Sequence, residues 1–230
     1  MNLQHIDVVD LVFKAIAFLF AISIHESAHA WMANRCGDPT ARMLGRISLN
    51  PIRHIDPVGT LLLPAIGLIS GGGVFGWAKP TPVDPRNFRE PMRDDILTSV
   101  AGPVSNFLVA GGAVLLLAAI SLTSPLGHQL VSDRAYGIPS DNSASMLVPA
   151  TAFFYEVMFI NVILAVFNLI PVPPLDGSHV LRHFLPDAAR RAYDSMGMFA
   201  LIALVVFGGP LLSRLIVPFL RFFILILRSL

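Results

Sequence analysis

The chain has 230 residues, of which 54% are hydrophobic and only 13% charged, and its mean hydropathy is +0.69. A soluble domain carries about a quarter charged residues and a disordered chain pairs low hydrophobicity with high net charge, so both classes are excluded and a membrane protein is indicated. A formal net charge of +1 with scattered lysines and arginines argues against nucleic-acid binding, and the single cysteine, Cys36, excludes an intrachain disulfide.

Several apolar stretches follow one another along the chain. A spanning helix needs about 20 residues, and three stretches meet that length: 11–35, 96–121 and 149–170. The stretch 58–70 is apolar but short and contains Pro64, so we expect a re-entrant element there. Gly102 and Gly111-Gly112 in the second span are expected to allow close helix packing.

The hydrophobic segment 196–227 is long enough for one kinked span or a tight pair of helices, and it is broken at Gly208-Gly209-Pro210. Arg214, Arg221 and Arg228 recur every seven residues, so they share a face if the segment is helical. This stripe indicates that its last part lies along the membrane interface.

Lysine and arginine are distributed unevenly among the connections. The region 35–95 carries eight of them, 122–148 carries only Arg134, and 172–195 carries three. Because basic loops stay in the cytoplasm, we expect the N-terminus outside, 35–95 and 172–195 inside, and 122–148 outside. Within the inner region, 45–51 and 76–82 alternate or are rich in turn residues, which predicts short strands.

The sequence His25-Glu26-Ser27-Ala28-His29 lies within the first span. On a helix, positions four apart share a face, so both imidazoles can bind one zinc ion while Glu26 reaches the water on that ion and acts as its base. Ionisable side chains at mid-membrane are costly and usually mark function. The motif therefore predicts a metal site inside the membrane.

A catalytic zinc ion commonly takes three protein ligands and a water. The best source of the third is the stretch 168–177, Asn-Leu-Ile-Pro-Val-Pro-Pro-Leu-Asp-Gly, which closes a span on the same membrane side and offers the carboxylate of Asp176. His54 and His179 lie near these motifs. Since three ligands suffice, we expect both to support the site or to lie in loops.

Taken together, these motifs resemble the site-2 protease family of intramembrane zinc metalloproteases, which join His-Glu-x-x-His in one span to Asn-x-x-Pro-x-Pro-x-Leu-Asp-Gly in another. Residues 102–106, Gly-Pro-Val-Ser-Asn, match a third family motif at the start of the middle span. The stretches 45–51 and 76–82 resemble the membrane-associated strands of the short branch without a PDZ domain.

The resemblance implies roles for individual residues. His25, His29 and Asp176 would bind one Zn²⁺, and Glu26 would be the general base that later protonates the leaving amine. Asn168 would hold the extended substrate backbone. Asn106 would hydrogen-bond close to the site, and both asparagines are candidate substrate contacts.

We therefore expect an all-α polytopic membrane protein with about four to six transmembrane helices, a short re-entrant element and small cytoplasmic β-strands, forming one domain over 1–230. The expected activity is zinc endopeptidase cleavage within or near transmembrane segments of membrane proteins, in a prokaryotic cell membrane with the active site toward the cytoplasm. A membrane metal-ion transporter using the same His and Asp cluster is the alternative. Edge pairing with the inner strands could hold the substrate extended.

Overall fold

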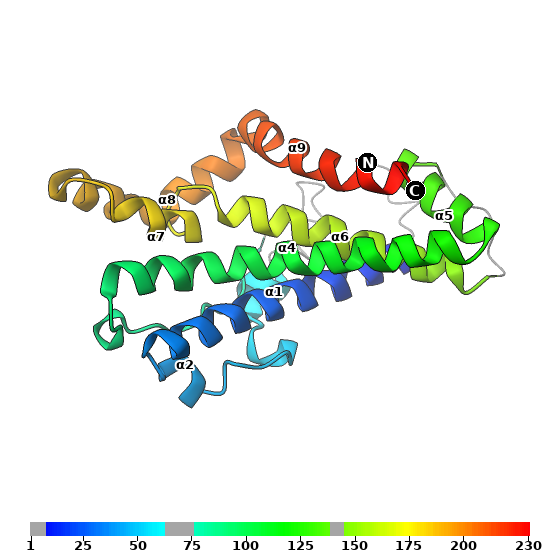
Figure 1. Ribbon diagram of the computed structural model, residues 1–230. Helices are drawn as coiled ribbons and strands as arrows, with labels where there is room; N and C mark the ends of the chain where they lie inside the picture. Colours follow the sequence, from blue (N-terminus) through cyan, green and yellow to red (C-terminus); the bar gives the residue numbers. More distant parts are fainter. Residues whose placement is uncertain (1–7, 63–75, 139–144) are drawn as a thin grey trace.

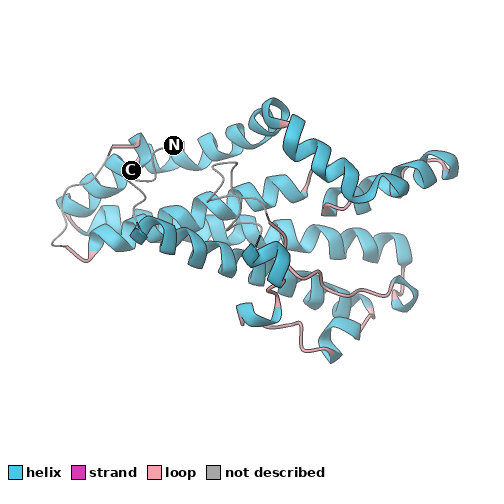
Figure 2. Cartoon of the chain, turned by 180° about the vertical axis from the view of Figure 1, so that it is seen from behind, coloured by secondary structure: helices cyan, strands magenta, loops and turns pink. Residues whose placement is uncertain are grey.

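A computed structural model describes residues 8–62, 76–138 and 145–230 of the chain (Figure 1). Among these residues the regular structure is helical (Figure 2). Four of the helices are long and apolar enough to cross a membrane: α1 (Val8–Cys36), α4 (Pro91–Thr123), α6 (Leu147–Asn168) and α9 (Gly209–Arg228). The predicted all-α fold is thus confirmed for the described residues, and the four candidate spans agree with the expected four to six.

Shorter helices connect these four. They are α2 (Thr40–Met43), η2 (Pro51–Arg53), η3 (Pro57–Leu62), η4 (Pro85–Asn87), α5 (Pro125–Tyr136), α7 (Asp176–Arg182) and α8 (Asp187–Phe207). The beginning of α1 and the end of α9 lie with α5 at one end of the bundle, and α2 and α7 lie at the other (Figure 1).

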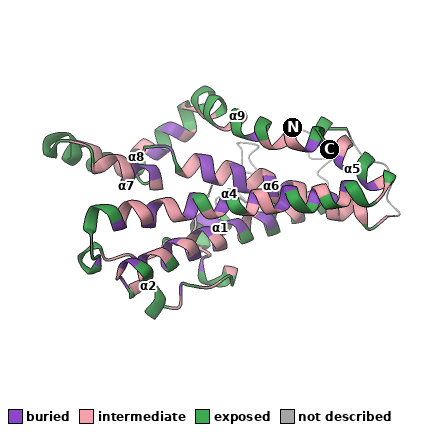
Figure 3. Cartoon of the chain, in the orientation of Figure 1, coloured by how far each residue is buried: buried purple, intermediate pink, exposed green. Residues whose placement is uncertain are grey.

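The core forms where α4 packs along both α1 and α6, which also touch each other. Its largest cluster joins Leu117 of α4, Met158 and Val162 of α6, and Leu220 and Leu227 of α9. The buried positions face inward between these helices (Figure 3). Because lipid is as apolar as leucine, such a cluster stabilises a membrane bundle by close packing and not by removal from water.

The end of α1 is set by Gly37, whose φ of +112° is favourable only for glycine. The amide of Asp38 then donates to the carbonyl of Ala33 over 2.9 Å and satisfies one of the last helical acceptors. A Cβ on Gly37 would lie 2.8 Å from the carbonyl oxygen of Asn87. The glycine therefore also permits the loop that precedes α4 to pack against the end of α1.

The expectation of β-strands at 45–51 and 76–82 is wrong, since within the described residues neither stretch pairs with another strand. The backbone N–H groups of 76–82 reach separate partners instead: Trp77 donates to Gly59, Lys79 to His54 and Thr81 to Glu26. Alternation and turn residues indicate an extended backbone, but a strand also needs a neighbour whose backbone is in register. No ladder can form from donors that diverge in this way.

Two further expectations concern apolar segments. The predicted re-entrant element 58–70 lies largely outside the described residues, and its first part belongs to the short helix η3. The segment 196–227 divides into two helices, since α8 ends at Phe207 and α9 begins at Gly209. Helix α9 packs along α6 and α5 and is long and apolar enough to cross a membrane. The interfacial position that its arginines indicate stays a prediction.

Asp38 ties three parts of the chain together just beyond α1. Its fully buried carboxylate accepts hydrogen bonds from the amide and hydroxyl of Thr40, from the amide of Asp84 over 2.8 Å, and from the side chain of Asn87 over 2.9 Å. Burial acts to raise the pKa of Asp38, but the hydrogen bonds from Thr40, Asp84 and Asn87 outweigh it and hold the pKa below its usual value.

Asp38→Asn should therefore lower the free energy of unfolding by about 1–3 kcal/mol at neutral pH, the size of a buried hydrogen bond to a charged group. Because the folded pKa lies below the unfolded one, the carboxylate stabilises the fold above about pH 4, and this stabilisation is lost as the pH falls through the folded pKa. Thermal unfolding in detergent from pH 7 to pH 3 measures both effects.

Asp187→Asn is the matched control, since that side chain is 78% exposed. Equal Tm values for the two variants at pH 7 would contradict the role given to Asp38.

Candidate metal centre

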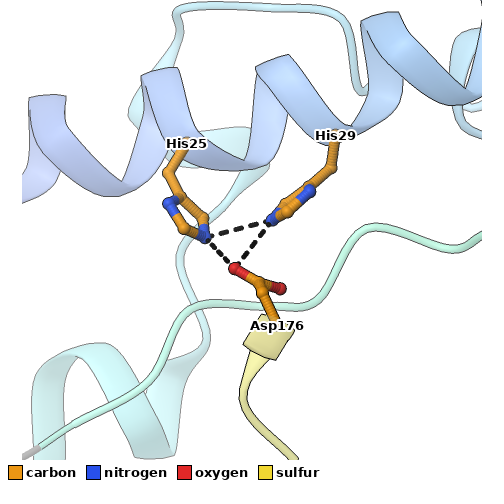
Figure 4. Close-up of side chains that lie close together, drawn as sticks. All are labelled: His25, His29 and Asp176. Carbon is orange, nitrogen blue, oxygen red and sulfur yellow. Dashed lines mark hydrogen bonds and ion pairs between the residues drawn. The ribbon is translucent and has the colours of Figure 1, made fainter. Parts of the chain in front are cut away.

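His25 and His29 lie one turn apart on α1 and project from the same face of the helix (Figure 4). Both side chains are buried, at 7% exposure each, and their Nε2 atoms are 3.1 Å apart. The spacing of four residues accounts for this, because side chains at i and i+4 of a helix stand one above the other.

The hydrogen bonds of the two rings fix which nitrogen carries the proton. Nδ1 of His29 lies 2.7 Å from the carbonyl oxygen of Thr98, which can only accept. Nδ1 of His25 lies 2.6 Å from Oδ1 of Asn106, whose Nδ2 is turned to the carbonyl of Ala21 at 3.2 Å and to Oδ1 of Asn161 at 2.7 Å. Both Nδ1 atoms therefore donate, and in the neutral rings both Nε2 atoms present lone pairs.

Asp176, the first residue of α7, completes the group (Figure 4). Its Oδ2 lies 3.1 Å from Nε2 of His25 and 3.3 Å from Nε2 of His29, yet this buried oxygen makes no hydrogen bond. Among the described residues, these three form the group of ligating side chains close enough to hold one metal ion. Ligand atoms about 2.1 Å from one zinc ion lie about 3.4 Å apart, so the donor set fits such an ion closely.

Asp176 reaches this position because α6 ends at Asn168 and a segment with three prolines follows. Ile170 and Leu175 of this segment pack against Leu201 and Leu204 of α8. At the far end of α7, Nε2 of His183 lies 2.7 Å from Oδ2 of Asp95 on α4. The carboxylate is thus placed by an apolar cluster on one side and a polar tether on the other.

Gly102 on α4 has no side chain, and this leaves room for the imidazoles of His25 and His29. We call this space at Gly102 the cradle. A Cβ at this position would lie 2.4 Å from Nε2 of His29 and 2.7 Å from Nε2 of His25. The expectation of close packing was incomplete, since what approaches Gly102 is the pair of imidazoles. At Gly111 and Gly112 a Cβ would meet nothing within 4 Å, so neither serves helix packing within the described residues.

Glu26 lies beside His25 on α1 and is half-buried. Its Oε2 accepts hydrogen bonds from the amide of Thr81 over 2.8 Å and from the hydroxyl of Thr81 over 2.7 Å. The structure therefore holds a carboxylate next to a metal ligand, in the place a general base needs.

The remaining candidates lie in different surroundings. Asn168 ends α6, and its Nδ2 donates to the carbonyl of Leu164 on its own helix over 3.0 Å. Nε2 of His54 donates to the carbonyl of Ser48 over 2.8 Å, and Nδ1 of His179 lies 3.9 Å from Asp95. Neither histidine belongs to the group of three.

The sequence motifs missed three contributors to the site: Thr81, the backbone of Thr98, and the link between Asn161 and Asn106. Each acts on a residue far away in the sequence, so the spacing of residues along the chain carries no signal for it. In that link, Oδ1 of Asn161 accepts the hydrogen bond from Nδ2 of Asn106.

Gly102→Ala should abolish or strongly weaken metal binding, because the added methyl group would displace both imidazoles. Metal content after purification, measured by inductively coupled plasma mass spectrometry, checks this. Gly111→Ala on the same helix is the control and should keep the metal, since a Cβ there meets open space. Full metal content in both variants would contradict the role of Gly102 in making room for the two imidazoles.

The chain is similar in sequence to predicted zinc metalloproteases. The chain is 36% identical over 210 residues to YwhC of Bacillus subtilis (strain 168), a predicted zinc metalloprotease, with 91% of this chain and 86% of YwhC covered. It is 31% identical over 199 residues to Rip2 of Mycolicibacterium smegmatis, described in the same way, with 86% of this chain and 67% of Rip2 covered. No solved structure gives a significant match. The model of peptidase family M50 matches residues 13–208, and the chain belongs to this family.

Proposed function

We propose that this protein is a zinc endopeptidase that cleaves peptide bonds within or near transmembrane segments of other membrane proteins. The observation that carries the proposal is the convergence of three ligand atoms, from His25, His29 and Asp176, inside a bundle of apolar helices. Membership of a peptidase family and the zinc metalloprotease relatives support zinc as the ion and proteolysis as the reaction.

His25, His29 and Asp176 would hold the ion, since their three free ligand atoms lie 3.1–3.3 Å from one another. Zinc bound there would act as a Lewis acid toward the scissile carbonyl and make the neighbouring water more acidic. Asn106 and the carbonyl of Thr98 would keep both rings in the tautomer that presents Nε2.

Glu26 would take the proton from the attacking water and pass it to the nitrogen of the leaving amine. Among described residues, both hydrogen bonds to its carboxylate reach Oε2, so Oε1 is the oxygen that would accept the proton. Asn168 lies at the entry to the segment that carries Asp176, and its Oδ1 would accept a hydrogen bond from the extended backbone of the substrate.

We place the centre in the cytoplasmic half of the bilayer of a prokaryotic cell. The basic region 35–95 supports this orientation. Arg35 stacks over the exposed ring of Trp31, 5.2 Å from its centroid, as an anchor at a membrane surface would. With a helical rise of about 1.5 Å per residue, His29 would then lie about 9 Å and His25 about 15 Å inside that surface. The family match from 13 to 208 in one stretch supports a single domain.

Glu26→Gln should reduce cleavage by about 10²- to 10⁴-fold while the zinc content stays at the wild-type level, because the amide cannot act as a base but the three ligands remain. Membrane proteomics of cells with the wild-type protein or the variant should reveal single-span proteins that accumulate uncut in the variant. A metal-ion transporter would instead retain its activity. The proposed peptidase activity would be refuted by two results together. The wild type and Glu26→Gln would carry zinc into proteoliposomes at equal rates, and no protein would accumulate uncut in the variant.

Asn106→Ala and Asn168→Ala should separate the two asparagines by their effects. The first removes the acceptor that orients His25, so zinc affinity should fall about 10- to 100-fold. The second should raise KM for a single-span substrate and leave zinc content unchanged. A rise in KM without loss of zinc in Asn106→Ala would instead make Asn106 a substrate contact.

A further inference from the structure

The segment from Lys79 to Asp84 crosses α1 beside Glu26, and we call it the strap. At its centre, Thr81 makes two hydrogen bonds to one carboxylate oxygen of Glu26, of 2.8 Å from the amide and 2.7 Å from the hydroxyl. The same hydroxyl lies 3.0 Å from the backbone carbonyl of Glu26. One residue of the strap thus contacts both the side chain and the main chain of Glu26.

Each end of the strap is held by a buried charged side chain. The guanidinium of Arg46 donates to the carbonyls of Lys79 over 3.1 Å and Pro80 over 2.8 Å, and also to the carbonyl of Arg53. At the other end, Asp38 accepts from the amide of Asp84 over 2.8 Å. Both Arg46 and Asp38 are buried, which is costly for charged groups unless each is hydrogen-bonded.

The stretch between these anchors is itself stiff. Thr81 stands between Pro80 and Pro82, whose rings fix φ and restrict the preceding residues to extended conformations. Pro80 and Pro82 also have no N–H group, so the amide of Thr81 is the donor that this part of the strap can offer to α1. The position of Thr81 is therefore determined from both sides before it meets Glu26.

We propose that Thr81 is a positioning residue that holds the carboxylate of Glu26 in its working orientation. A glutamate side chain has three rotatable bonds, and a general base must stay within about 0.5 Å of its productive position. Two hydrogen bonds to Oε2 fix the plane of the carboxylate and leave Oε1 free of protein donors among the described residues. The inference rests on the proposed role of Glu26 as the base.

Hydrogen exchange of single backbone amides tests the contact without any need for activity. In purified protein in detergent, Glu26→Ala should make the amide of Thr81 exchange at least about tenfold faster, while the amides of Lys79 and Asp84 keep their rates because their acceptors are elsewhere. Glu90→Ala removes an exposed carboxylate and is the control. An unchanged rate at Thr81 in Glu26→Ala would overturn the proposal.

Kinetics with fluorescein-labelled casein, an unfolded protein, test the consequence for catalysis. Thr81→Val removes the hydroxyl and keeps the branched shape, so kcat should fall about 10- to 100-fold with KM and zinc content unchanged. Thr81→Ser should restore most of kcat. Thr60→Val is the matched control, since the buried hydroxyl of Thr60 holds the neighbouring carbonyl of Trp77 over 2.8 Å and does not contact Glu26.

The outcomes separate this inference from the function on which it rests. An unchanged kcat in Thr81→Val, or an equal fall in Thr60→Val, would overturn the positioning role while cleavage by the wild type still supported the peptidase. Failure of the wild type to cleave casein would count against the proposed function, and the exchange rate of Thr81 would then decide alone whether Thr81 holds Glu26.

Discussion

The structure depends on three lone pairs that point at one small volume among apolar helices. Hydrogen bonds commit the Nδ1 protons of His25 and His29 to Asn106 and Thr98, so both Nε2 atoms face the carboxylate of Asp176 as acceptors. When both rings are neutral, these acceptors 3.1–3.3 Å apart repel one another, and a low dielectric strengthens that repulsion. A cation removes the repulsion, so the polar core favours a bound metal ion.

Different helices supply the ligands of the metal centre and the groups that orient them. Helix α1 brings two ligands by its own periodicity, and α4 provides the acceptors and the space at Gly102. The third ligand comes from α7, whose start is decoupled from α6 by the prolines that end the span. Because one ligand lies on a short helix outside the spans, the geometry of the site depends on how α7 docks. The apolar cluster of Ile170 and Leu175 and the Asp95–His183 pair determine that docking.

The parts of the site that follow from local geometry could be predicted from the sequence. His25 and His29 share a face on any helix, and Asp176 follows a proline-rich helix end that must turn. Gly102 gave a weaker signal, since a glycine in a membrane span fits ordinary helix packing equally well. Thr81 gave none, because it is 55 residues from Glu26 and the contact exists only once the strap has crossed α1.

Two parts of the fold show that a sequence pattern does not identify the partner of a segment. The pattern of 76–82 correctly indicates an extended backbone, but its hydrogen-bond partners are a helix and loops, which no alternation along the chain encodes. In α9 the arginine stripe indicates a membrane interface, and the structure adds that its last member, Arg228, packs over the ring of Tyr136 and donates to the carbonyl of Ala135. A charged side chain at a helix end can hydrogen-bond a nearby backbone carbonyl as well as interact with a membrane surface. Periodicity thus predicts which face a residue occupies, while its partner is decided by packing.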